Sequence, residues 1–121
     1  MGESFRDLQV WQRAIELTVA TYQLTSRFPK EEIFALSNQL KRASVSVASN
    51  IAEGYGRSTT RDYLQFLAIA RGSISEVETQ LVIDRKLRFG REEDLAQAEK
   101  LTVEVGKMLN GLIKSLRAAS P

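Results

Sequence analysis

Very few helix-breaking residues divide the chain into four long stretches in which apolar side chains recur at spacings of three and four. Only two prolines and seven glycines occur among the 121 residues. This spacing places side chains on one face of an α-helix, and the period-two alternation of a strand is missing. The pattern therefore predicts an all-α protein with helices over about 6–28, 30–53, 60–88 and 92–118.

The expected helix boundaries rest on a few residues with strong local preferences. Pro29 suits the first position of the second helix, where its missing N–H costs nothing. Gly54–Gly56 can adopt positive φ and end that helix. Thr59 and Asp62 form a capping pair for the third helix, and Gly90 is expected to stop it.

Connections of a few residues require consecutive helices to run antiparallel. We therefore expect one domain over residues 1–121, folded as an antiparallel up-down-up-down four-helix bundle. The expected buried stripes are Leu8, Trp11, Ile15, Thr18, Tyr22 and Thr25 in the first helix, with Ala14 and Val19 widening it; Ile33, Leu36, Leu40, Ala43, Val47 and Ile51 in the second; Tyr63, Phe66, Leu67, Ala70, Ile74, Val77 and Leu81 in the third; and Leu95, Ala98, Thr102, Val105, Leu109, Leu112 and Leu116 in the fourth.

The third and fourth helices carry apolar residues beyond these stripes. The additional residues are Leu64, Ile69, Ile83, Leu101, Val103, Met108 and Ile113. Exposed apolar area beyond a few hundred Å² usually marks an interface, so we expect a homo-oligomer that is built through these two helices. The alternative is a broader core stripe within one subunit.

The chain has neither cysteine nor histidine. This composition excludes Ser-His and Cys-His nucleophile pairs, zinc sites of the Cys/His type and the Glu-x-x-His di-iron motif. The remaining acids and bases form no recognisable catalytic constellation. We therefore expect that the protein is not an enzyme and that it binds no cofactor, no metal and no small-molecule substrate.

The overall charge does not identify a partner. Seventeen basic and fifteen acidic residues give a net charge of +2, far from the excess of a protein that coats DNA. The apolar runs are too short to cross a membrane, and the first residues include charged Glu3, Arg6 and Asp7 instead of a signal-peptide pattern. These features predict a cytoplasmic protein that does not interact with membranes.

Three segments together resemble a known family. They are Phe5–Trp11, Phe28–Gly54 and Phe66–Glu78, and the most specific part is Ser46–Gly54. The chain is similar to the 23S rRNA intervening-sequence protein family, whose members are small four-helix bundles. Ala48 stands where the family often has proline, and alanine continues a helix more easily.

The resemblance implies a bacterial protein that assembles as a homopentamer. The family is similar in fold to the accessory proteins of diversity-generating retroelements, which form a pentameric barrel that contacts reverse transcriptase and nucleic acid. Family membership implies no specific biochemical activity.

Within the segment of resemblance, Asn50 and Glu53 share one face near the end of the second helix. A carboxylate is disfavoured there by the helix dipole and needs a partner, which Arg57, Arg61 or Arg71 could supply. We expect a buried or half-buried polar clasp in preference to a substrate site. Gly72 and Ser73 of the third helix are expected to pack closely against the small side chains of the second helix, which are Ala43, Ser44, Ser46, Ala48, Ser49 and Ala52.

A weakly basic bundle end is expected where the loop after the second helix meets the chain termini. Its candidate partner-binding residues are Tyr55, Arg57, Arg61, Lys107, Lys114 and Arg117. Tyr55 could stack on a base or fill a site on a neighbouring subunit. The alternative for the basic residues is an ordinary solvated helix end.

Three functions follow in order of preference. The first is an oligomeric binding or scaffold protein associated with RNA or a ribonucleoprotein through the basic end. The second is a protein–protein adaptor that binds no nucleic acid, and the third is an enzyme.

Overall fold

The computed structural model describes residues 4–119, which form four long α-helices and two short 3₁₀-helices. The elements are η1 (Phe5–Asp7), α1 (Gln9–Thr25), η2 (Lys30–Glu32), α2 (Leu36–Tyr55), α3 (Thr60–Leu87) and α4 (Glu92–Ala119). The described residues contain no strand. The all-α prediction is therefore confirmed.

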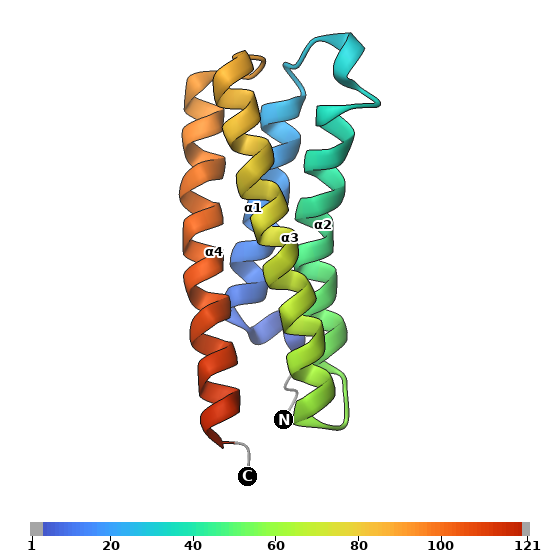
Figure 1. Cartoon of the computed structure of the whole chain (residues 1–121), viewed down its shortest axis with the longest axis vertical. Coiled ribbons are helices and arrows are strands. Elements are labelled where there is room, and N and C mark those ends of the chain that lie inside the picture. The colour runs from blue at the N-terminus through green and yellow to red at the C-terminus, as the bar shows by residue number, and fades with distance from the viewer. Residues whose placement is uncertain (1–3, 120–121) are drawn as a thin grey trace.

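Consecutive helices run antiparallel, in the up-down-up-down order (Figure 1). Each helix packs against two others: α1 and α3 each contact α2 and α4. The α1/α2 and α3/α4 faces therefore lie on opposite sides of the bundle. The α2–α3 turn lies at the same end as the beginning of α1 and the end of α4 (Figure 1).

The first helix begins at Gln9, three residues later than expected. Ser4 and Asp7 form a capping box, in which the Ser4 Oγ accepts the Arg6 N–H and the Asp7 carboxylate accepts the Ser4 N–H. Leu8 then adopts an extended backbone with ψ 125°. The capping box therefore closes a separate 3₁₀ turn before α1 starts.

The second helix begins at Leu36 and not near residue 30. Pro29 instead precedes the three-residue η2, in which the Ile33 N–H bonds to the Lys30 carbonyl in a 3₁₀ pattern. Ile33 and Phe34 point outward, with 54% and 93% of their surface exposed. Because no packing surface holds this stretch, it does not adopt a regular α-helix.

The end of α2 also differs from the expectation. The helix continues through buried Gly54 to Tyr55, and Gly56 caps it with φ −81°, a right-handed conformation. Gly54 is needed because α3 lies against it: an added β-carbon would be 2.8 Å from the Phe66 Cβ. The prediction of positive φ at Gly54 and Gly56 is wrong, since close helix approach explains Gly54 instead.

The expected cap of α3 is confirmed, because the Thr59 side chain accepts the Asp62 N–H at 3.1 Å. At its other end, Arg88 and not a glycine takes the left-handed conformation, with φ 60°. Gly90 lies in the following turn, where a β-carbon would collide with the Leu24 side chain. This glycine allows the turn to pack on α1.

The buried face of α1 matches the prediction only in part. Ala14 and Thr25 are buried as expected, and Leu8, Trp11 and Thr18 are half-buried. Ile15, Val19 and Tyr22 are all exposed. The buried series is Val10, Ala14, Leu17, Thr21, Leu24 and Phe28. Both series have spacings of three and four, so periodicity alone cannot choose between them.

The buried stripes of α2, α3 and α4 largely follow the prediction. Exceptions are Ile33, which is exposed, and Tyr63, Phe66, Leu112 and Leu116, which are half-buried. Leu101 and Ile113 each keep only 3% of their surface exposed. These two residues of the expected oligomer surface are therefore core residues of one subunit.

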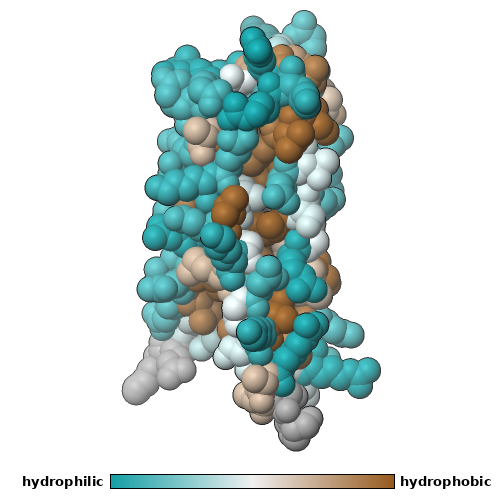
Figure 2. Space-filling view, turned by 60° about the vertical axis from the view of Figure 1, so that its left-hand side comes forward, coloured by the Kyte–Doolittle hydropathy of each residue, from teal (hydrophilic) through white to brown (hydrophobic). Residues whose placement is uncertain are grey.

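Apolar side chains also remain on the outside. Figure 2 shows them as patches that hydrophilic side chains separate along the length of the bundle. On the α1/α2 face the exposed residues are Ile15, Val19, Tyr22 and Val45. On α3 and α4 they are Ile69, Val82, Ile83, Leu87 and Val103. Apolar surface is thus available on both sides of the bundle.

Candidate nucleic-acid interface at one end of the bundle

The bundle end that holds the α2–α3 turn has an excess of basic side chains. Among described residues, the segments 4–13, 53–62 and 107–119 contain seven basic and three acidic side chains. At the opposite end, segments 27–36 and 84–94 contain six of each sign. The charge separation along the bundle therefore favours anion binding at one end only.

Three of the predicted basic residues form one stripe on α4. Lys107, Lys114 and Arg117 are exposed, and none forms an ion pair within residues 4–119. Gly111 lies between the two lysines at helical spacing, and a β-carbon there would meet nothing within 4 Å. The stripe is thus open to a phosphate backbone.

Arg57 is engaged within its own subunit. Its Nη2 lies 2.7 Å from the Glu53 Oε2, and its guanidinium lies 4.5 Å from the centre of the Phe66 ring. Arg61, by contrast, is exposed at the start of α3. Of the two loop arginines, Arg61 is therefore the better placed to reach a ligand.

Tyr55 is half-buried and packs edge-on against Tyr63, with ring centres 6.1 Å apart. Burial raises the pKa of Tyr63, and the nearby Tyr55 phenol raises it further. The Tyr55 ring thus stabilises the base of α3 within its own subunit. The contact with Tyr63 leaves part of the Tyr55 side chain at the surface.

The structure does not bring the predicted polar clasp together. Glu53 pairs only with Arg57 among the candidate arginines, and both side chains are exposed. The Asn50 amide instead donates to the Ser46 carbonyl and hydroxyl. Arg71 reaches Asn110 on α4, at 3.4 Å. Arg57, one of the three candidate arginines, is thus the partner of Glu53. The expectation of a buried or half-buried clasp is wrong, because this pair is exposed, Asn50 bonds within α2 and Arg71 bonds to α4.

The close packing expected between α2 and α3 is present at two points. The Ser46 and Ser73 hydroxyls lie 2.9 Å apart, and Gly54 faces Phe66. Gly72 does not take part: it is exposed, and a β-carbon there would meet nothing within 4 Å. Ser46 and Ser73 therefore make the predicted small-residue contact without Gly72, and Gly54 adds a contact that was not predicted.

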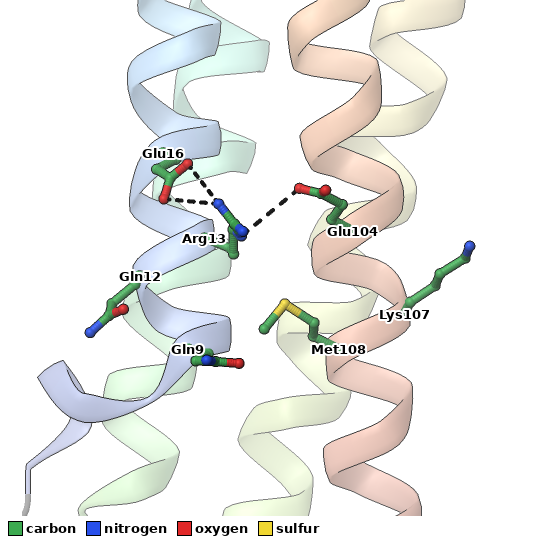
Figure 3. Close-up of a pocket in the computed structure, with 7 residues that line it drawn as sticks. All are labelled: Gln9, Gln12, Arg13, Glu16, Glu104, Lys107 and Met108. Atoms are coloured by element: carbon green, nitrogen blue, oxygen red, sulfur yellow. Dashed lines mark hydrogen bonds and ion pairs between the residues drawn. The ribbon is translucent and has the colours of Figure 1, made fainter.

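A groove of about 510 Å³ runs between α1 and α4, next to the basic stripe (Figure 3). Its lining is Gln9, Gln12, Arg13, Glu16, Glu104, Lys107 and Met108. Figure 3 shows that Arg13 lies between the two carboxylates and that Gln9 and Met108 face the space between the helices. Lys107 points outward at the rim (Figure 3).

Sequence reasoning did not find this groove. Gln9 and Arg13 lie near the start of the chain, whereas Glu104 and Met108 lie near its end. No local motif connects them, because only the packing of α1 on α4 brings them together. The available signal was the helical spacing of polar side chains in α1 and in α4. A solvated helix face has the same pattern, so this signal does not indicate a groove.

Residues 4–119 contain no group of three or more histidine, cysteine, aspartate or glutamate residues that could hold a metal ion. None of the described helices is both long and apolar enough to span a membrane.

Comparisons with known proteins relate this fold to a family. A solved structure, of a protein with unknown function from the S23 ribosomal protein family of Bacteroides thetaiotaomicron, superposes with a TM-score of 0.79. It is 24% identical, and the alignment covers 87% of this chain and 98% of that chain. A search of the curated proteins finds no match. Residues 6–111 match the family model of the 23S rRNA-intervening sequence protein. The chain therefore belongs to the 23S rRNA-intervening sequence protein family.

Proposed function

We propose that this protein is a non-enzymatic, homo-oligomeric binding or scaffold protein in the cytoplasm that associates with RNA or a ribonucleoprotein through its basic end. The observation that carries this proposal is the uneven charge of the bundle, with seven basic and three acidic side chains in the described segments of one end. Family membership adds support, because the family takes its name from sequences inserted in 23S rRNA.

One subunit offers too few cations for strong binding. Each phosphate contact contributes modestly and weakens with salt. When several copies present the same stripe around one axis, binding at one stripe raises the effective concentration at the next. The proposed function therefore requires assembly, and the family resemblance implies five subunits.

The proposal is tested by the affinity of the purified protein for structured RNA at increasing salt. The paired change Lys114→Glu and Arg117→Glu should weaken binding by roughly tenfold or more at low salt. It should also lower the slope of log affinity against log salt by about one per lost phosphate contact. Both residues are exposed and form no ion pair in the described part of the chain, so folding should persist.

The matched control reverses two lysines at the opposite end, Lys30→Glu and Lys86→Glu. Both are exposed, and the net charge changes by the same amount. This control should retain most of the affinity. Equal losses in the two variants would show that overall charge and not the basic end governs binding, and no binding by the unchanged protein would refute direct RNA association.

Self-association is proposed through two opposite faces of the bundle. On the α1/α2 face, Lys41 and Arg42 border a surface groove that contains Tyr22 and Val45. On the α3/α4 face, Glu78 and Glu99 border a groove that contains the exposed Val82. The first groove is thus basic and apolar. The second is acidic and apolar, and because Arg85 pairs with Glu99, Glu78 is its carboxylate without an ion pair in the described residues.

Complementary faces on opposite sides favour a head-to-tail contact, which forms a closed ring when the rotation between subunits closes. This proposal revises the expected interface, which involved α3 and α4 only. Leu101 and Ile113 are unavailable because they lie in the core. In the revised proposal, the α1/α2 face of one subunit contacts the α3/α4 face of the next.

A charge exchange tests this contact. Lys41→Glu or Glu78→Lys alone should weaken assembly, because each places like charges across the interface. Both changes in the same chain should restore it, and native mass spectrometry would report the subunit number in each case. Unchanged assembly in both single variants would contradict the proposed faces.

The second candidate function is a protein–protein adaptor, and one observation favours it. Phe34 in the α1–α2 connection has 93% of its surface exposed, beside the exposed Ile33. Exposed aromatic side chains are typical anchors of protein interfaces. Affinity purification that recovers one protein and no RNA, and loses that protein with Phe34→Ser, would select the adaptor.

A further inference from the structure

The interior of the α1/α4 groove has no positive excess, although it adjoins the basic stripe. Its charged side chains are Arg13, Glu16 and Glu104, and Lys107 points outward at the rim. One positive and two negative charges do not attract a phosphate into the groove. The groove is instead suited to a neutral, polar group that is attached to a phosphate chain outside.

The Arg13 guanidinium is held in place by the two carboxylates. Its Nη1 lies 3.2 and 3.3 Å from the Glu16 carboxylate oxygens, and its Nε lies 3.9 Å from the Glu104 Oε1. All three side chains keep between 38% and 51% of their surface exposed. A fixed, accessible guanidinium plane is a stacking surface for a nucleobase.

Hydrogen-bonding groups and an apolar contact complete the lining. Gln9 is exposed and faces the space between α1 and α4, while the half-buried Met108 supplies a thioether on the α4 side (Figure 3). A carboxamide offers both a donor and an acceptor, as a base edge requires. The Glu104 carboxylate offers only acceptors, and such a group pairs with an exocyclic amino group.

The groove continues into the stripe on α4. Lys107 lies at its rim, and Lys114 follows seven residues later on the same helix face, about 10 Å along the axis. Gly111 leaves the surface between them free of a side chain. A strand with one base in the groove could therefore place its neighbouring phosphates on these lysines.

We propose that the α1/α4 groove binds an unpaired, amino-bearing nucleobase of RNA, with Gln9 and Glu104 on the base edge, Arg13 on its face and Lys107 and Lys114 on the adjoining phosphates. This inference rests on the proposed RNA association and names the site that would confer base preference on it. Adenine and cytosine carry the required amino group, and uracil does not.

The test compares fluorescently labelled single-stranded oligo(A), oligo(C) and oligo(U) by anisotropy at low salt. Oligo(A) and oligo(C) should bind at least roughly threefold more tightly than oligo(U). Gln9→Ala should remove most of this preference with little effect on oligo(U). The matched control is Gln23→Ala, an exposed glutamine of α1 outside the groove, which should change nothing.

Glu104→Lys separates base recognition from overall attraction. It replaces the acceptor with a donor and adds positive charge, so oligo(U) should bind more tightly while the preference for oligo(A) and oligo(C) is lost. Equal binding of the three oligonucleotides by the unchanged protein, or an unchanged preference in both groove variants, would overturn the groove assignment.

The outcome also separates this inference from the proposed function. If Lys114→Glu with Arg117→Glu abolishes binding while the groove variants behave normally, RNA association stands and the groove assignment fails. If the unchanged protein binds none of the oligonucleotides and no structured RNA, both are refuted. Binding of an acidic peptide in place of every RNA would likewise refute both.

Discussion

Gly54 of α2 lies so close to Phe66 of α3 that an added β-carbon would be 2.8 Å from the Phe66 Cβ. The same atom would be 3.0 Å from the Tyr63 Cδ1 and 3.2 Å from the Tyr63 carbonyl oxygen. Neither the helix backbone nor a Cβ can move away as a flexible chain end can. The packing of α2 on α3 beside the basic end therefore depends on the absence of a side chain at Gly54.

Gly54→Ala should destabilise the protein although alanine is the better helix former. Alanine in a helix gains about 1 kcal/mol over glycine. Overpacking against Phe66 and Tyr63 should cost roughly 1–3 kcal/mol and outweigh that gain. Urea unfolding measures the difference. The control is Gly111→Ala in α4, where a β-carbon meets nothing within 4 Å, and it should stabilise by about 0.5–1 kcal/mol. Stabilisation by both changes would contradict the close approach.

Asp84 makes the stability of the protein depend on pH. Its Oδ1 accepts the N–H groups of Phe89 and Gly90, each at 3.1 Å, while its buried Oδ2 has no hydrogen-bond partner among the described residues. Burial raises the pKa of Asp84 above its ordinary value, and this effect exceeds the opposing effects of the two N–H groups and of Arg85. The folded state therefore holds the Asp84 proton more tightly than the unfolded state.

Because the pKa of Asp84 is higher in the folded protein, protonation of this group favours folding. This contribution to stability is complete below the unfolded pKa, near 3.8 for aspartate, and it is lost as the pH rises through the folded pKa. The stability of Asp84→Asn relative to the unchanged protein should therefore increase from about pH 3 to pH 7. The hydrogen bond from Arg85 lowers the pKa of Glu99, so Glu99 changes stability with pH in the opposite direction. This effect cancels in the comparison, because Glu99 is present in both the unchanged protein and Asp84→Asn. Unfolding curves at several pH values test this, and a constant difference would rule the effect out.

Glu53→Gln should have little effect on stability. Glu53 and Arg57 form an ion pair four residues apart, with 57% and 41% of their side chains exposed. Exposed pairs contribute little, so the change should stay within about 0.5 kcal/mol. Thermal unfolding at low salt is the appropriate measurement. A larger loss would restore the idea of a buried clasp around Glu53.

Arg85→Ala should lower the melting temperature at low salt, and the loss should shrink at high salt. Arg85 donates to Glu92 at 3.1 Å and to Glu99 at 2.7 and 2.9 Å, and so connects α3 to α4. Salt screens such exposed charges. Lys86→Ala, an exposed neighbour without an ion pair in the described residues, should show neither the loss nor its salt dependence. A loss that high salt leaves unchanged would indicate lost packing instead.

The four helices and their order could be predicted because they depend on local information. Residues three and four apart meet on one helix face wherever the helix lies, and short connections leave only antiparallel neighbours. The Thr59 cap follows the same rule, since the group that it satisfies is three residues away. The basic end could be located for a related reason, because helix order alone places its segments together.

The features that the sequence left undecided depend on residues far apart in the chain. In α1, two apolar series have equal helical spacing, and only contact with the other helices selects the one through Leu17 and Leu24. In the same way, Leu101 and Ile113 look like surplus surface until α4 is packed into the bundle. Local periodicity carries no information about which face meets a neighbour.

The sequence by itself determined the helical class, the number of helices, their order and the end at which positive charge gathers, since each follows from neighbours along the chain. Tertiary structure alone decided that Gly54 serves a close contact, that Arg71 reaches α4 and not Glu53, and that Gln9 shares a groove with Glu104. These relationships join side chains from different helices, and their distances are set by how the helices pack.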